Sequence, residues 1–106
     1  MRQMSATQLK TYLDKVEQAP LLLDVREPWE FQICAIDNSR LIPMGQIASA
    51  APELNPEQET VVICHHGIRS RSVAHYLERI GFTNVINLQG GVEAWARDVD
   101  PHMQTY

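Results

Sequence analysis

The centre of the chain reads Val61-Val62-Ile63-Cys64-His65-His66-Gly67-Ile68-Arg69-Ser70. An apolar run ends on a cysteine, a short polar loop with one glycine follows, and a helix-forming segment then begins. This order predicts a strand that delivers the Cys64 thiol to its carboxyl end, beside the amino end of a helix. Unpaired backbone N–H groups and the helix dipole stabilise an anion at such a place. The thiol there should lose its proton easily and react as a thiolate.

Three apolar runs predict the strands of a sheet, at residues 21–25, 60–64 and 85–88. In the first two runs the apolarity is continuous rather than alternating, which is typical of strands covered on both faces in a parallel sheet. Helical patterns separate them, so we expect an α/β sandwich with a mostly parallel sheet of four or five strands and helices on both faces. Ligands bind beyond the carboxyl ends of strands in such sheets, where Asp24 and Cys64 both lie.

Helices are predicted from apolar spacing and from start and stop signals. Ser5 and Gln8 form a capping-box pattern at the start of the first helix, and Gly81 fits the stop after the helix that follows the loop. Residues 2–4 could form a short edge strand, and residues 98–106 should lie along the surface. The expected helices are 5–16, a short one beginning at Pro28, 44–51, 70–80 and a short one after Gly91.

Composition sets limits on the class of protein. The 106 residues suit one domain spanning 1–106. The net charge of −4, without a long basic run, argues against a nucleic-acid partner. No apolar run is long enough to cross a membrane, and no apolar signal segment is visible, so we expect a cytoplasmic protein with reduced thiols. The two cysteines, Cys34 and Cys64, form no Cys-x-x-Cys pair.

Three motifs resemble those of rhodanese-type sulfurtransferases. Cys64 to Arg69, followed by Ser70, is similar to the family's Cys-x-x-x-x-Arg active-site loop. Residues 24–31, Asp-Val-Arg followed by Glu and an aromatic, resemble a second signature, and residues 85–95, a strand with Gly-Gly and a Trp-bearing helix, resemble the closing one. The resemblance implies the rhodanese-like three-layer sandwich. It also implies a cysteine that takes sulfane sulfur from a donor, becomes a persulfide and passes the sulfur to an acceptor, without a further cofactor.

The segment between these signatures departs from the common family pattern. Many rhodaneses carry Gly-His-Ile-Pro-Gly-Ala here, whereas this chain has residues 30–34 followed by Leu41-Ile42-Pro43. This form resembles rhodanese domains fused to ubiquitin-activating-like adenylyltransferases of the MoeB/ThiF type, which pass sulfur toward cofactor synthesis and tRNA thiolation. The partners implied are a small sulfur donor, thiosulfate or a persulfide, and a thiol or protein acceptor.

Roles for the site residues follow from their chemistry. Backbone N–H groups of residues 65–70 (His65, His66, Gly67, Ile68, Arg69 and Ser70) could hold the persulfide, with Gly67 permitting the backbone curl. Arg69 offers a fixed charge for an oxyanion such as thiosulfate. Either histidine could stabilise the thiolate, touch the donor or face solvent. No metal is expected, because adjacent residues on a tight loop rarely converge on one ion.

Several alternatives remain open from the sequence. Asp24 and Arg26 either line the sheet end that faces the cysteine or pair with each other to order the loops. Cys34 suits a small core side chain better than a second reactive thiol. Cysteine phosphatases use Cys-x-x-x-x-x-Arg, one residue longer, and Ser70 stands where their arginine would be. A rhodanese-fold module without turnover, or a sulfur-relay carrier that docks on a partner enzyme, is the remaining alternative.

Overall fold

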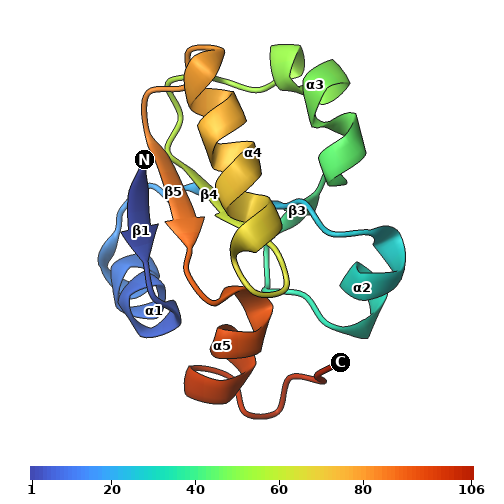
Figure 1. The fold of residues 1–106 in the computed structure, drawn as a ribbon. Coiled ribbons are helices and arrows are strands. Elements are labelled where there is room, and N and C mark those ends of the chain that lie inside the picture. The colour runs from blue at the N-terminus through green and yellow to red at the C-terminus, as the bar shows by residue number, and fades with distance from the viewer.

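The sheet has five strands, and all of its pairings are parallel. The computed structural model describes residues 1–106, and the strand order is β1-β5-β4-β2-β3 (Figure 1). The strand that carries Cys64 at its end therefore lies in the middle of the sheet, and residues 2–4 form an edge strand. The strands are β1 Arg2–Met4, β2 Leu21–Asp24, β3 Arg40–Leu41, β4 Thr60–Ile63 and β5 Val85–Leu88.

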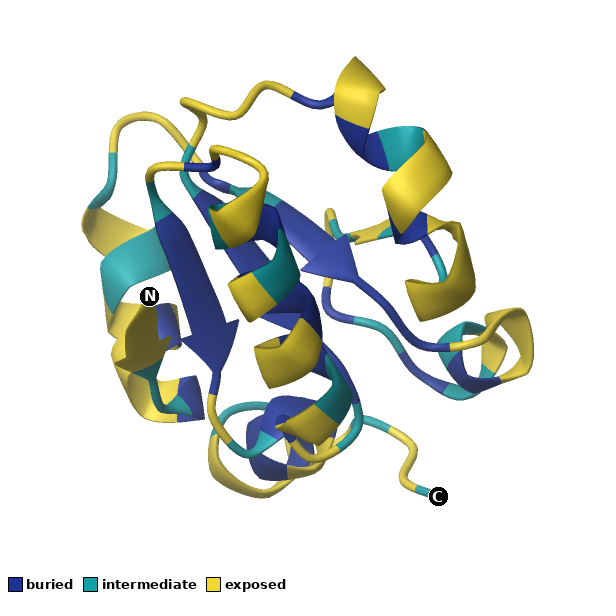
Figure 2. Cartoon of the chain, turned by 45° about the horizontal axis from the view of Figure 1, so that its top comes forward, coloured by how far each residue is buried: buried dark blue, intermediate teal, exposed yellow.

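Helices cover both faces of the sheet, which gives the expected three layers. Helices α1 (Ala6–Lys15) and α5 (Gly91–Asp98) lie on one face, and α3 (Ile47–Ala50) and α4 (Ile68–Arg79) on the other (Figure 1). Strands β4 and β5 are buried along their whole length and β2 is buried from its second residue on, whereas the edge strands β1 and β3 carry exposed residues (Figure 2). Successive side chains along a strand point to opposite faces. Val61 and Ile63 therefore pack on the α1/α5 side, and Val62 and Cys64 on the α4 side.

Helices α1 and α4 both begin where the local sequence contains a start signal, the capping box at Ser5 and the glycine at residue 67. At α1, Ser5 Oγ accepts a hydrogen bond from Gln8 N at 3.2 Å, and Gln8 Oε1 accepts one from Ser5 N at 2.9 Å, as the capping box predicted. Helix α4 begins at Ile68, two residues earlier than predicted, because Gly67 with φ +95° ends the loop. Ile68 and Arg69 thus belong to the first turn of the helix rather than to a loop.

Two segments differ from the sequence prediction. The helix expected over residues 44–51 is replaced by the 3₁₀ turn η1 (Met44–Gln46), α3 and a second 3₁₀ turn η2 (Ala51–Glu53). Pro52 lies in the first turn of η2, where a proline is tolerated, and it ends α3 at Ala50. Strand β3 was not predicted. It has only two residues, which are too few to show a sequence pattern. It forms by pairing with β2, with Arg40 opposite Leu23 and Leu41 opposite Asp24.

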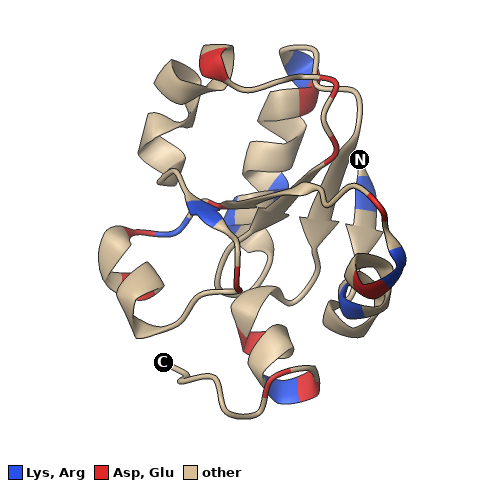
Figure 3. Ribbon diagram, turned by 180° about the vertical axis from the view of Figure 1, so that it is seen from behind, with Lys and Arg blue, Asp and Glu red and all other residues tan.

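The remaining chain surrounds the carboxyl ends of the strands. Helix α2 (Pro28–Ile33) follows β2. The segment after α5 ends at Tyr106, which lies near α2 (Figure 1). Lysine and arginine positions are scattered among acidic ones when the chain is seen from behind (Figure 3). None of the helices is long and apolar enough to cross a bilayer.

Candidate active site

The sulfur of Cys64 lies inside the turn that joins β4 to α4. Gly67 N donates a hydrogen bond to Cys64 Sγ at 3.1 Å and Ser70 N donates one at 3.3 Å. The Ser70 hydroxyl is a third contact, with its oxygen 3.3 Å from the sulfur. Cys64 is only 1% exposed. Two of the amides that the sequence suggested thus point at the sulfur, and they are donors that a negative charge on it would need.

Two glycines allow the backbone to close around this sulfur. Gly67 has φ +95°, and a Cβ there would lie 3.0 Å from Gly90 N. Gly91 has φ +60°, and a Cβ there would lie 2.3 Å from the carbonyl oxygens of both Cys64 and His65. The reason is that the first turn of α5 donates to those carbonyls, from Val92 N at 2.9 Å and from Glu93 N at 3.1 Å. Helix α5 therefore holds the loop from the other side.

Arg69 is held by Glu30 of α2 in a two-pronged ion pair. Arg69 Nη1 and Nη2 donate to Glu30 Oε2 and Oε1, each at 2.8 Å. Glu30 is buried and also accepts from Tyr106 Oη at 2.8 Å and from Glu27 N at 2.9 Å. Hydrogen bonding to Arg69 lowers the pKa of Glu30 to about 2, against the effect of burial. The positive charge expected at Arg69 is present and partly offset by its carboxylate partner.

Asp24 and Arg26 form a buried ion pair with each other. Arg26 Nη2 lies 2.8 Å from Asp24 Oδ2, and both side chains are fully buried. The same guanidinium donates to Cys34 O at 2.7 Å and to Tyr106 Oη at 2.9 Å. It contacts the chain on both sides of α2, and neither residue hydrogen-bonds to Cys64. Of the two interpretations left open, the geometry matches the ordering of the loops. Cys34 is buried among core side chains.

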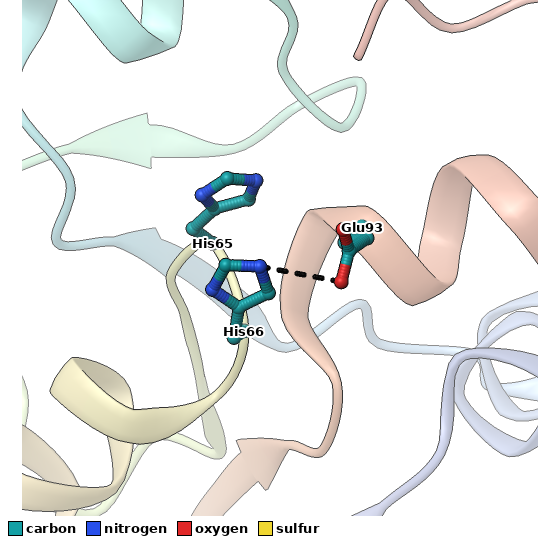
Figure 4. A group of neighbouring side chains, drawn as sticks. All are labelled: His65, His66 and Glu93. Atoms are coloured by element: carbon teal, nitrogen blue, oxygen red, sulfur yellow. Dashed lines mark ion pairs between the residues drawn. The ribbon is translucent and has the colours of Figure 1, made fainter. Parts of the chain in front are cut away.

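The two histidines and Glu93 lie together at the loop (Figure 4). The rings of His65 and His66 are stacked with centroids 3.9 Å apart and 25° between their planes, and Tyr106 stacks on the other face of His65, also at 3.9 Å. Burial and the neighbouring His66 lower the pKa of His65, which favours the uncharged ring. His66 Nε2 lies 3.2 Å from Glu93 Oε2. The lone pair of an imidazole nitrogen lies in the plane of its ring. Because the two rings are nearly parallel, their lone pairs point alongside one another and not toward one shared metal ion.

Comparison with known proteins places this geometry in a family. The model of the rhodanese-like domain matches residues 5–98. The chain belongs to the rhodanese-like domain family. It is 35% identical over 101 residues to the probable adenylyltransferase/sulfurtransferase MoeZ of Mycobacterium tuberculosis, covering 93% of this chain and 26% of that protein. It is 38% identical over 79 residues to the thiosulfate sulfurtransferase GlpE of Pseudomonas syringae, covering 74% of each.

A solved structure confirms the rhodanese-like fold. The crystal structure of a rhodanese-like domain protein from Staphylococcus aureus superposes with a TM-score of 0.83 at 32% identity, over 90% of this chain and 91% of that one. A rhodanese-like/PpiC domain-containing protein 12 of Arabidopsis thaliana is 42% identical over 89 residues. This chain spans 30% of that relative's length and 26% of the length of MoeZ.

Three residues of this rhodanese-like site were missed by sequence reasoning. Glu30 lies in the segment that begins with Asp-Val-Arg, and this position could have indicated a role in the site. Its partner Arg69 is 39 residues later in the chain, so the sequence did not show the pairing. Asn87, which accepts from Ser70, interrupts the apolar run of β5, and that interruption was a second signal. Tyr106 was placed only on the surface, whereas it is half-buried against His65 and Glu30, and its segment has no pattern that shows this.

Proposed function

We propose that this protein is a sulfurtransferase that carries sulfane sulfur as a persulfide on Cys64. The observation that carries the proposal is the pair of backbone donors, Gly67 N and Ser70 N, that point at Cys64 Sγ. Such donors stabilise a negatively charged sulfur without any rearrangement during the reaction. The loop also contains one residue fewer between cysteine and arginine than a phosphatase loop, and that smaller ring suits a single added sulfur atom.

The reaction has two displacements at sulfur. The Cys64 thiolate attacks the outer sulfur of thiosulfate; the bond between the two thiosulfate sulfurs breaks, and sulfite leaves with the electron pair. The product is the persulfide Cys64–S–S⁻. A nucleophilic acceptor, a thiolate or cyanide, then attacks the outer sulfur and the Cys64 thiolate leaves. No cofactor is needed, since the persulfide itself is the carrier.

The charge at Arg69 supports an anionic small donor such as thiosulfate, and exposed apolar side chains support a protein partner. Ile68, on the first turn of α4, is 75% exposed, and Trp29 of α2 is 60% exposed. Trp29 contacts Tyr106, which in turn stacks on His65, so this surface adjoins the loop. We propose a small thiol or a protein as the acceptor, with no nucleic acid or membrane involved. A reducing compartment such as the cytoplasm would keep both free thiols reduced.

The test is persulfide formation on the purified chain. After incubation with thiosulfate, the intact mass should increase by one sulfur atom, and cyanide should release that sulfur as thiocyanate. The increase should vanish in Cys64→Ser and persist in Cys34→Ser, the matched control for the other buried thiol. A mass increase that follows Cys34, or none with thiosulfate or any organic persulfide, would refute the proposal and favour a module without turnover.

A further inference from the structure

A buried polar chain runs from the Cys64 sulfur through β5 to the edge of the sheet. The Ser70 hydroxyl contacts Cys64 Sγ, and it lies 2.5 Å from Asn87 Oδ1. Asn87 Nδ2 donates to Gly67 O at 3.2 Å and to Gln3 Oε1 of β1 at 2.9 Å. Ser70 and Asn87 are 0% and 2% exposed, so water does not supply alternative partners.

The direction of each hydrogen bond in this chain follows from one carbonyl. Gly67 O can only accept, so the group of Asn87 that faces it must be the amide nitrogen. The other end of Asn87, its oxygen, then faces Ser70 and can also only accept. The single hydroxyl proton of Ser70 must therefore lie on the bond to Asn87, and Ser70 presents oxygen lone pairs to Cys64 Sγ.

We propose that Asn87 is a positioning residue that holds the Ser70 hydroxyl as an acceptor toward Cys64 Sγ, so that this contact favours the neutral thiol over the thiolate. This proposal refines the proposed function by assigning control of the nucleophile's charge. The sequence motif alone suggests a thiol that ionises freely. Here only two backbone amides donate hydrogen bonds to the sulfur, because a hydroxyl that turned toward it would leave the buried Asn87 oxygen without a donor.

Substitutions at Asn87 separate this role from simple loosening of the site. Asn87→Leu removes the acceptor, so the Ser70 hydroxyl can donate to the sulfur. Asn87→Asp is the matched control, because it loses the same two N–H donations but keeps an acceptor for Ser70. A new hydrogen bond to a charged sulfur raises the thiolate population about tenfold. Since nucleophilicity falls as the thiol becomes more acidic, the rate of alkylation at low pH rises about threefold.

The experiment measures the pH dependence of Cys64 alkylation by iodoacetamide, followed by the mass of the Cys64 peptide. We expect the midpoint of the Asn87→Leu profile to lie about one pH unit below wild type, and that of Asn87→Asp to be no lower than wild type. Ser70→Ala should not raise the midpoint. In Asn87→Leu combined with Ser70→Ala the decrease should disappear. Asn87→Asp adds a carboxylate near the loop, which by itself also disfavours the thiolate. The other titratable groups around the loop are the same in all variants: Glu30, Arg26, Asp24, His65, His66, Arg69 and Glu93.

Two results would overturn the proposal. A Ser70→Ala midpoint above wild type would mean that the hydroxyl already donates to the sulfur. A decrease in Asn87→Leu that survives the added Ser70→Ala change, or that Asn87→Asp shares, would mean a looser or wetter site instead. Alkylation needs no sulfane sulfur, so this result remains readable even if the chain fails to form a persulfide with any donor.

Discussion

The buried carboxylate of Glu30 should contribute a large and pH-dependent share of stability. Its pKa is about 2 in the folded protein, against an ordinary value of 4.5. Its side chain is only 4% exposed, whereas that of its partner Arg69 is 36% exposed, so solvent screens part of the interaction. Each pKa unit corresponds to about 1.4 kcal/mol, which gives about 3 kcal/mol for ionised Glu30 at neutral pH. Glu30→Gln keeps the shape of the side chain and removes this charge.

The sign of the pH dependence follows from the lowered pKa. The contribution is complete above the ordinary value and is lost as the pH falls through about 4 toward 2, because the unfolded carboxyl binds its proton first. Urea denaturation should therefore show Glu30→Gln to be less stable than wild type by about 3 kcal/mol at pH 7, with a gap that shrinks to about half or less at pH 3.

The control is Glu53→Gln, an exposed carboxylate that makes no side-chain hydrogen bond or ion pair. It should change stability by less than about 0.5 kcal/mol at either pH. A Glu30→Gln gap below about 1 kcal/mol at pH 7, or a gap equal at both pH values, would show that the buried Glu30 carboxylate is not paired with Arg69 in solution.

Three further outcomes follow from the site. Gly91→Ala should destabilise the protein by several kcal/mol in thermal melts, since its Cβ would meet two carbonyl oxygens at 2.3 Å, whereas Gly45→Ala, with nothing within 4 Å, should be nearly neutral; equal effects would contradict the close approach. Tyr106→Phe should cost about 1–3 kcal/mol and remove from the ultraviolet titration the phenol whose pKa burial raises to about 12; loss of a phenol that titrates near the ordinary value of 10 instead would place Tyr106 in solvent. Arg69→Ala should weaken the use of thiosulfate more than that of a neutral sulfane donor, with Arg69→Lys intermediate; equal losses with both donors would remove Arg69 from donor binding.

The sequence determined the elements and the position of the nucleophile. Continuous apolar runs are readable because a strand buried on both faces has no polar side, and they predicted β2 and β4. Strand β5 was predicted from a short apolar run that Asn87 interrupts. The capping box at Ser5 depends only on residues within one turn, and so does the positive φ at Gly67, which glycine adopts easily. Both features can therefore be predicted from the local sequence. The placement of Cys64 between a strand and a helix needed no information from elsewhere in the chain. Strand β3 carries no such signal, since two residues are too few to show a period.

Only the tertiary structure decided which groups surround that cysteine. Glu30 contacts Arg69 across 39 residues, and Tyr106 contacts Glu30 across 76, because the carboxyl ends of parallel strands gather segments that are distant in the chain. The role of Asn87 likewise depends on the order β5-β4, which places it on the same face as Ser70. Hydrogen-bond direction is a property of such a packed set of donors and acceptors, and no single segment contains it.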